Sequence, residues 1–334
     1  MKRGAVFLAF LLILSSIALG GCSDNGIDGS EIEYIADFMS KEVLEENLVS
    51  GDFTYTSYTD STCSVTGYSG EGALEIPEAL DGYTVIGVES MAFFENTDIT
   101  SVVLADSVEY VGQYAFYGCS SLESVTLGES IYKLCDYAFS SGESESVLTT
   151  IIWNGVPYYI DEGCFYGCDA LSTLDLPEGI RRISAYAFYG CKSADSIILY
   201  DTLYSIGEKA FAYCTGATKI VIPSSCGTIG DSAFYACEGA TAITISDGVE
   251  TIGDSAFEQC ISLTEVTIPS SVEEMGDYVF YNCESLEAVT IDGYLEDIGT
   301  DCFSGCSEEL VATIPDSAVL QEYFEDAGIS YTND

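Results

Sequence analysis

Acidic and cysteine side chains are the abundant groups in this chain that could do chemistry. The 334 residues include 55 Asp plus Glu and 14 Cys but no His. Without histidine, no Ser-His or Cys-His nucleophile can form, which leaves a pair of carboxylates of the kind that glycosidases use. Asp175 and Glu265 are the only acids at the strand positions expected to face outward. They lie four repeats apart, about 19 Å at the spacing of stacked strands, so we predict no catalytic residues and no enzyme.

The cysteines favour packing over chemistry. Eight of them lie three residues after a repeated phenylalanine. These are Cys119, Cys168, Cys191, Cys214, Cys237, Cys260, Cys283 and Cys306. In stacked repeats their β-carbons would lie about 4.8 Å apart, beyond the ~3.5–4.5 Å of a disulfide, so we expect buried free thiols. Cys164 with Cys168 and Cys302 with Cys306 lie across one tight turn and are the best disulfide candidates. A file of thiols does not converge on a metal ion, and we predict no cofactor.

Four acids occupy the same place in consecutive repeats, three residues before the phenylalanine. They are Glu208, Asp231, Asp254 and Asp277. One interpretation is that each caps a short helix by accepting from free backbone N–H groups. Another is that the carboxylates repel one another and bind calcium. We predict no metal site. If the chain binds calcium, these four residues are the candidate ligands.

All of these side chains take their positions from one repeat. Ten phenylalanines recur at intervals of 23 residues, except for 26 between Phe139 and Phe165. They are Phe93, Phe116, Phe139, Phe165, Phe188, Phe211, Phe234, Phe257, Phe280 and Phe303. A fixed period in this range is the signature of a solenoid, in which stacked coils share one core.

The stretch from Ile252 to Val272, IGDSAFEQCISLTEVTIPSSV, represents one coil. Val266 and Ile268 alternate inward like a strand, whereas Ala256-Phe257 indicates a turn on the other side. Gly253 before the turn suggests a bend too tight for a β-carbon, and Gly207, Gly230, Gly276 and Gly299 repeat it. We therefore predict an α/β solenoid of about ten 23-residue coils, with a parallel sheet on one face and short helical or 3-10 turns on the other.

Two surfaces of this solenoid are candidates for binding. The outward sheet positions are mostly Ser and Thr, with apolar residues at Val103, Ile152, Ile198 and Val221. A run of tyrosines directly follows the repeated phenylalanine and offers large contact area at low entropic cost. The run comprises Tyr117, Tyr166, Tyr189, Tyr235 and Tyr281. The predicted ligand-binding residues are Ile152, Ile198, Val221, Tyr166, Tyr189 and Tyr235.

The longer interval contains Ser140 to Ser146 (SSGESES) and the only tryptophan, Trp153. We interpret the segment as a surface bulge compensated by a bulky core residue. Such a bulge is either a tolerated insertion or a contact site.

The N-terminus predicts export. Lys2 and Arg3 precede an apolar run that is too short to span a bilayer, and residues 1–21 read as a signal peptide. Leu19-Gly20-Gly21-Cys22 resembles a bacterial lipobox, which implies lipidation of Cys22; an ordinary cleaved signal is the alternative. The net charge of −46 disfavours nucleic acid as a partner.

The remaining boundaries follow from the change of pattern along the chain. We predict a polar tether over residues 22–30, a short amphipathic helix over 31–52 and a β-rich N-terminal cap over 53–77. The leucine-rich solenoid covers 78–315. A C-terminal cap covers 316–334, with a closing helix whose Val319, Leu320, Tyr323 and Phe324 face inward.

The repeat AFxxCxxLxxVxIPxxVxxIG resembles the BspA-like leucine-rich repeat family of bacterial and protist surface proteins. It is most complete at Ala256-Phe257, Cys260, Leu263, Val266, Ile268-Pro269, Val272 and Met275-Gly276. Thr62 to Pro77 also resembles the cap that precedes such repeats. The resemblance implies an extracellular solenoid that acts in adhesion or coaggregation, and it transfers no catalytic or binding residue to this chain.

Taken together, these patterns predict a lipid-anchored protein at the bacterial cell surface. It would bind a protein or adhere to host or microbial surfaces. Its partner would be an extracellular protein or glycan, and its membrane contact would be the N-terminal lipid. A polysaccharide-binding module and a structural or self-association spacer are the alternatives.

Overall fold

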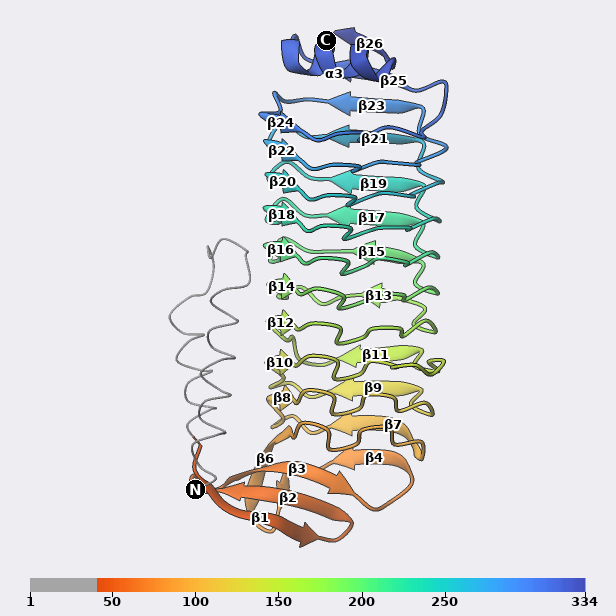
Figure 1. The fold of residues 1–334 in the computed structure, drawn as a ribbon. Coiled ribbons are helices and arrows are strands. Elements are labelled where there is room, and N and C mark those ends of the chain that lie inside the picture. Colours follow the sequence, from red (N-terminus) through yellow and green to blue (C-terminus); the bar gives the residue numbers. More distant parts are fainter. Residues whose placement is uncertain (1–40, 334) are drawn as a thin grey trace, which may run out of the picture. The chain divides into compact units, whose positions relative to one another are not determined.

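The computed structural model describes residues 41–333. The predicted signal peptide, the lipidation site Cys22, the tether over 22–30 and the first part of the predicted helix lie outside the described residues. Val43–Asp334 forms one compact unit. Within it, the chain winds into coils that stack directly on one another (Figure 1).

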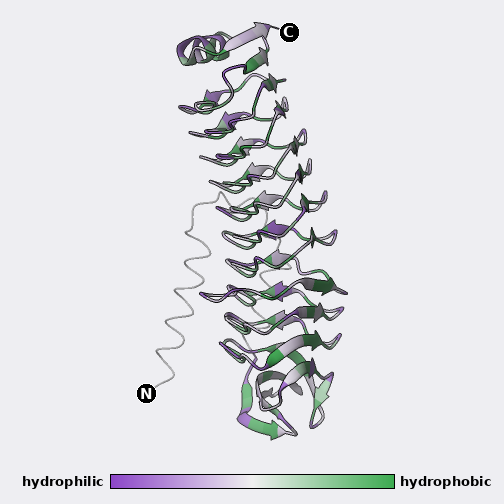
Figure 2. Ribbon diagram, turned by 90° about the vertical axis from the view of Figure 1, so that its right-hand side faces the viewer, coloured by the Kyte–Doolittle hydropathy of each residue, from purple (hydrophilic) through white to green (hydrophobic). Residues whose placement is uncertain are grey.

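Each coil contributes one strand to each of two parallel ladders. The first ladder consists of three sheets of four strands each. Its strands are β4 (Gly72–Ile76), β7 (Ile99–Leu104), β9 (Ser124–Leu127), β11 (Thr150–Trp153), β13 (Leu174–Asp175), β15 (Ser196–Ile198), β17 (Lys219–Ile222), β19 (Ala242–Ile245), β21 (Glu265–Ile268), β23 (Ala288–Ile291), β25 (Val311–Ile314) and β26 (Ser330–Asn333). Inward and outward residues alternate along these strands, and Figure 2 shows the resulting mixture of hydrophobic and hydrophilic positions.

The second ladder is one continuous sheet of mostly two-residue strands. Its strands in the repeats are β8 (Tyr110–Val111), β10 (Lys133–Leu134), β12 (Tyr159–Ile160), β14 (Arg182–Ile183), β16 (Ser205–Ile206), β18 (Thr228–Ile229), β20 (Thr251–Ile252), β22 (Glu274–Met275) and β24 (Asp297–Ile298). The prediction of a solenoid is confirmed. The prediction of a single parallel sheet is incomplete, because a second inward-facing segment in each coil also pairs with its neighbours.

The other face is predicted to carry short helical or 3-10 turns, and the structure has single turns with hydrogen bonds between residues three apart but no helix there. Phe257 N donates to Val279 O in the next coil at 2.9 Å, whereas Ala256 N donates to Gly253 O at 3.3 Å within its own coil. The backbone N–H groups thus alternate between a turn and the neighbouring coil, which a helix does not permit. Within residues 41–333, the only helix is α3 (Ala318–Ala327).

Left-handed backbone recurs two residues before and two residues after the repeated phenylalanine. Around Phe257 these residues are Ser255, with φ of 56°, and Gln259, with φ of 61°. Both interrupt any helix, because consecutive helical residues need negative φ. They convert the segment into a series of tight turns, which we call the turn face.

The repeated phenylalanines form the core of the stack. Successive rings from Phe165 to Phe280 lie 5.3 Å apart between centroids, with interplanar angles of 4–9°. Phe324 of α3 continues the row against Phe303 at 5.6 Å. Ser317 caps the start of α3, and Gly328 closes its end in left-handed conformation. Leu320 and Phe324 are buried as expected, but Val319 is exposed.

The N-terminal cap is formed by antiparallel hairpins that join the second ladder. Its strands are β1 (Val43–Ser50), β2 (Phe53–Tyr58), β3 (Thr62–Tyr68), β5 (Ala79–Leu80) and β6 (Tyr83–Val88). The helix predicted over 31–52 is therefore wrong over Val43–Ser50. Asn47 has a positive φ of 59°, and the turn at Gly51 brings β1 against β2. Exposed Val43, Leu44 and Val49 show that the apolar spacing of this stretch does not mark a buried face.

The glycines before the turn are needed because neighbouring coils approach closely at these positions. The bend itself does not require glycine. None of Gly207, Gly230, Gly253, Gly276 and Gly299 has positive φ. A β-carbon at Gly230 would lie 2.7 Å from the carbonyl carbon of Gly207. Only glycine allows the two backbones to approach this closely.

The longer interval between Phe139 and Phe165 does not disturb the register of β11 against β9. Trp153 pairs in register with Leu127 and packs edge-on against Phe165 at 6.1 Å. Within the inserted segment, Ser140 and Ser141 are buried, whereas Glu143, Ser144 and Glu145 are exposed.

Candidate functional site

The repeated thiols form a hydrogen-bonded file along the core. Each donates to the carbonyl oxygen of a phenylalanine in an earlier coil, for example from Cys214 Sγ to Phe188 O at 3.4 Å and from Cys237 Sγ to Phe211 O at 3.3 Å. Burial raises the pKa of Cys214 to about 12. A thiol with so high a pKa is not a nucleophile at neutral pH.

All thirteen cysteines in the described part of the chain are free. The expectation of buried free thiols is confirmed for the eight repeated cysteines except Cys306, which is free but half-buried. The disulfide candidates Cys164–Cys168 and Cys302–Cys306 are wrong, because these side chains satisfy carbonyl groups or pack in the core. Cys302 Sγ lies 3.2 Å from both Gly276 O and Gly299 O.

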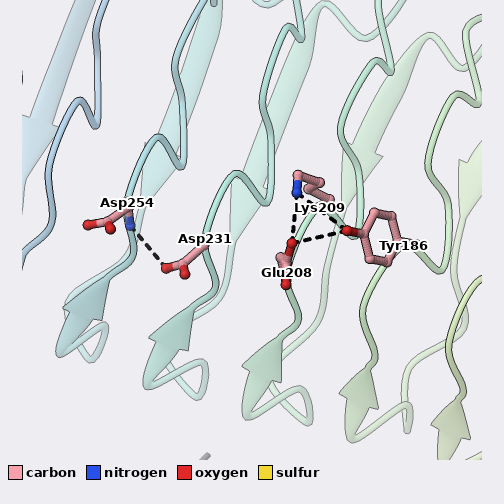
Figure 3. Close-up of polar contacts among 5 residues, drawn as sticks. All are labelled: Tyr186, Glu208, Lys209, Asp231 and Asp254. Carbon is pink, nitrogen blue, oxygen red and sulfur yellow. Dashed lines mark hydrogen bonds and ion pairs between the residues drawn. The ribbon is translucent and has the colours of Figure 1, made fainter. Parts of the chain in front are cut away.

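The acidic file connects neighbouring coils through the backbone. Asp231 Oδ1 accepts from Asp254 N at 3.1 Å, and Asp254 Oδ1 accepts from Asp277 N at 2.8 Å. Capping is therefore present, but between coils, and the predicted caps of short helices within one coil are wrong. Figure 3 shows the first of these contacts beside the different arrangement at Glu208.

Glu208 belongs to a small cluster of side chains that binds the ammonium group of a lysine from the same chain. Lys209 Nζ lies 2.7 Å from Glu208 Oε1 and 5.4 Å from the centroid of the Tyr186 ring. Tyr186 OH donates to the same carboxylate oxygen at 3.0 Å (Figure 3). The hydrogen bond from Lys209 lowers the pKa of Glu208. Lys209 Nζ also donates to Tyr186 OH at 3.3 Å. A carboxylate and a tyrosine hydroxyl group thus hold one ammonium group on the turn face.

The predicted sheet-face residues do not form one patch. Ile198 and Val221 are half-buried and pair in register, with the acid Asp175 on the other side of Ile198. Ile152 is exposed on β11, which belongs to a different four-stranded sheet. This face therefore offers two small apolar areas rather than one continuous surface.

The predicted tyrosines belong to a larger row of rings on the turn face, which we call the aromatic ladder. Its members are Phe94, Tyr114, Tyr117, Tyr137, Tyr166, Tyr186, Tyr189, Tyr213 and Tyr235. Tyr166 and Tyr189 stack at 4.8 Å and 1°. Tyr213 then joins Tyr189 to Tyr235 through T-shaped contacts of 5.2 and 5.3 Å. Tyr281 lies outside the ladder and contacts Tyr278.

One end of the aromatic ladder borders a groove of about 820 Å³, which we call the insertion groove. Met91, Phe94, Tyr114 and Tyr117 line one part of it, and Ser141, Glu143 and Ser144 of the inserted segment line another. Met91 is 55% exposed and Phe94 is 37% exposed. The groove thus combines accessible apolar surface with carboxylates.

Comparison with known proteins identifies the repeat. Six copies, in residues 88–216 and 204–327, match the family described as BspA type leucine rich repeat region. The chain belongs to this family. The matched residues include the whole aromatic ladder and the insertion groove, so both surfaces are parts of a BspA-type solenoid.

Several solved structures are similar to this BspA-type chain. A leucine-rich repeat protein from Bacteroides ovatus is 21% identical over 86% of this chain and 100% of its own, with a TM-score of 0.34. The T. pallidum leucine-rich repeat protein is 25% identical over 86% and 98%, with a TM-score of 0.39. The pneumococcal vaccine antigen PcpA is 15% identical over 88% and 99%, with a TM-score of 0.48. No curated protein matches. The family assignment rests on the repeat match.

The BspA-type repeat indicates a scaffold, and no catalytic family is indicated. Among residues 41–333, no group of three or more His, Cys, Asp or Glu side chains is placed to hold a metal ion. In the same part of the chain, no helix is long and apolar enough to cross a membrane.

Sequence reasoning missed several residues of the turn face. Met91, Tyr114, Tyr137 and Tyr186 lie two residues before the repeated phenylalanine, and Tyr213 lies two residues after one. The signal was present as a second aromatic column at this position. The column that directly follows the phenylalanine, which includes Tyr166, Tyr189 and Tyr235, is only one of the two columns.

The acidic file of this BspA-type solenoid makes a prediction about stability. Asp254→Ala removes the acceptor for Asp277 N and should lower the free energy of unfolding by about 1 kcal/mol. Asp254→Asn keeps an oxygen at this place and should cost less than half as much. Urea denaturation of both variants, with and without calcium, measures these effects. A calcium-dependent gain of stability that Asp254→Asn abolishes would instead support the calcium hypothesis for Glu208, Asp231, Asp254 and Asp277.

Proposed function

We propose that this BspA-type solenoid is a binding protein of the bacterial cell surface that recognises an extracellular protein through its turn face. The aromatic ladder carries the proposal. It runs from the coil of Phe93 to that of Phe234, and its rings are packed together instead of being scattered over the surface. Tyrosine is enriched where proteins bind one another, because it brings large contact area with a hydroxyl group at its tip.

The arrangement of the rings favours a protein over a polysaccharide as the partner. Phe94 stacks on Tyr117 at 5.1 Å and 6°, and Tyr166 stacks on Tyr189 at 4.8 Å and 1°. A ring face that another ring covers is not available to a sugar. The edges and hydroxyl groups that remain accessible suit hydrogen bonds and apolar contacts with an irregular protein surface.

A lipid on Cys22 would hold the protein at the membrane. The support is the signal-like segment 1–21 and the cysteine that follows Leu19-Gly20-Gly21. Because the net charge is −46, an anionic membrane surface would repel the protein, and an acyl anchor supplies the attraction that charge cannot.

Binding of the unlipidated chain from residue 23 onward to panels of extracellular matrix proteins and glycans tests the proposal. We expect saturable binding to a protein. The double variant Tyr189→Ala/Tyr235→Ala should weaken it at least about tenfold. The sheet-face variant Ile198→Ser/Val221→Ser is the matched control and should bind like the unchanged protein.

Other outcomes would contradict the proposal. Binding only to glycans, lost in the tyrosine variant, would establish the polysaccharide alternative. A folded protein that binds neither panel and self-associates with concentration would be a structural spacer. Loss of binding in the sheet-face variant alone would move the site to the first ladder.

A further inference from the structure

The insertion groove has a fixed wall. Ser141 N donates to Tyr166 O at 2.9 Å, and Ser141 Oγ donates to Gly167 O at 2.9 Å. A β-carbon at Gly142 would lie 2.8 Å from the Tyr117 ring, so the inserted backbone lies directly against that ring. The insertion is therefore anchored to the next coil and to the aromatic ladder, and it is not a loose loop.

The other residues that line the groove include an aromatic and apolar group. Tyr114 and Tyr117 meet at 77° with centroids 5.5 Å apart, and they form a corner. Phe94 stacks behind Tyr117. The phenol hydroxyl groups of Tyr114 and Tyr117 are hydrogen-bond acceptors for a cationic side chain, and exposed Met91 supplies an adaptable apolar contact.

The groove carries negative charge without a basic residue. Glu95 and Glu143 line it, and no lysine or arginine is among its lining residues. Elsewhere on the turn face, the ammonium group of Lys209 donates to the Glu208 carboxylate at 2.7 Å and to the Tyr186 hydroxyl group at 3.3 Å (Figure 3). The protein thus shows how it holds an ammonium group with a tyrosine and a carboxylate, and the groove offers the same groups to a cation from outside.

From these contacts we propose that the insertion groove binds a lysine or arginine side chain in an extended segment of the partner protein. The aliphatic stem lies on Met91 and Phe94, and the charged end lies between Tyr114, Tyr117 and the two carboxylates. A volume of about 820 Å³ exceeds the needs of one side chain and accommodates flanking apolar residues. The inference rests on the proposed protein-binding function and names the chemistry of the partner.

Fluorescence anisotropy with a short synthetic peptide tests the proposal. The probe carries arginine flanked by leucine and tryptophan, and a matched peptide has glutamine in place of arginine. At about 0.15 M salt, which screens distant charges, the arginine peptide should bind the full-length protein at least about tenfold more tightly than the glutamine peptide.

The control variants separate the groove from the general negative field. Glu95→Gln/Glu143→Gln should weaken binding of the arginine peptide at least about tenfold. Glu238→Gln/Glu284→Gln removes the same charge from exposed positions four residues after Phe234 and Phe280, the place that Glu143 occupies relative to Phe139. This control should change the affinity less than about twofold.

Equal weakening in both double variants would overturn the inference, because the attraction would then be non-specific. Equal binding of the arginine and glutamine peptides would also overturn it. Glu95→Gln/Glu143→Gln is tested in parallel against the protein panel. If it still binds a panel protein and no peptide binds the unchanged chain, the groove inference fails while the proposed function stands. If the arginine peptide binds but the unchanged chain binds no protein of the panel, the groove inference stands and the proposed function fails.

Discussion

Above pH 9 the protein should lose stability much more steeply than a protein without buried thiols. Burial raises the pKa of Cys168, Cys214 and Cys260 from 9.0 to about 12. The folded state therefore favours the protonated thiol, and its contribution is complete below the pKa of the unfolded thiol. It is lost as the pH rises from about 9 through about 12. Each such thiol removes about 1.4 kcal/mol per pH unit in this window.

Several thiols act together, which makes this the largest effect that we expect. Burial also raises the pKa of Cys191, Cys237 and Cys283 well above the ordinary value. A domain is typically stable by about 5–15 kcal/mol, so the stack should unfold within one to two pH units above pH 9. Circular dichroism during urea denaturation at pH 7 to 11, without oxygen and with a reductant, measures the loss.

A triple variant tests whether the thiols are the source. Cys214→Ala/Cys237→Ala/Cys260→Ala should be less stable at pH 7 but should lose stability less steeply between pH 9 and 10. Buried tyrosines such as Tyr110, whose ordinary pKa is 10.0, begin to contribute in the same window, but they are identical in both proteins, so the difference between the two slopes reports the cysteines. An unchanged slope in the variant would refute the thiol explanation.

Gly230→Ala should lower the free energy of unfolding by about 3 kcal/mol or more. The new β-carbon would lie 2.7 Å from Gly207 C, 2.8 Å from Glu208 N and 2.9 Å from Ile206 O. All three are backbone atoms, so no side-chain rotation relieves the contact. The coils would have to separate, which stretches the hydrogen bond from Gly230 N to Ile206 O, now 2.8 Å.

Gly227→Ala is the control in the same coil. A β-carbon there meets nothing within 4 Å, and the φ angle of Gly227 is not left-handed. The substitution should be neutral or should stabilise by up to about 1 kcal/mol, because it restricts the unfolded chain. Urea midpoints at neutral pH compare the two variants. Similar losses in both would show that the coils do not depend on the glycine contact.

The period of the phenylalanines was sufficient to predict the stack, because equal spacing places the same side chain at the same depth in every coil. It also predicted the free state of Cys214 and its neighbours, since their spacing along the file exceeds that of a disulfide. Trp153 was recognised as a core residue for the same reason. These features depend only on the register of one coil against the next.

The errors arose where the outcome depends on backbone contacts that spacing does not encode. Val43 and Leu44 have helical spacing, yet pairing with β2 determines that they form a strand. Thr251–Ile252 is too short to resemble a strand until the two neighbouring coils supply β18 and β22 as its partners. The insertion groove required Met91, Phe94 and Tyr117 to be placed beside Glu143, and these residues are brought together only by stacking.

The left-handed positions of the turn face have a consequence for engineering this fold. Met91, Tyr114, Tyr137 and Tyr186 all have φ between 54° and 61°, where a residue with a β-carbon is about 1 kcal/mol less favourable than glycine. Gly163 occupies the same position without interrupting the stack. Replacing the three tyrosines by glycine would relax the backbone but remove rings that form the aromatic ladder. Selection for heat resistance and selection for recognition would therefore act on the same positions in opposite directions.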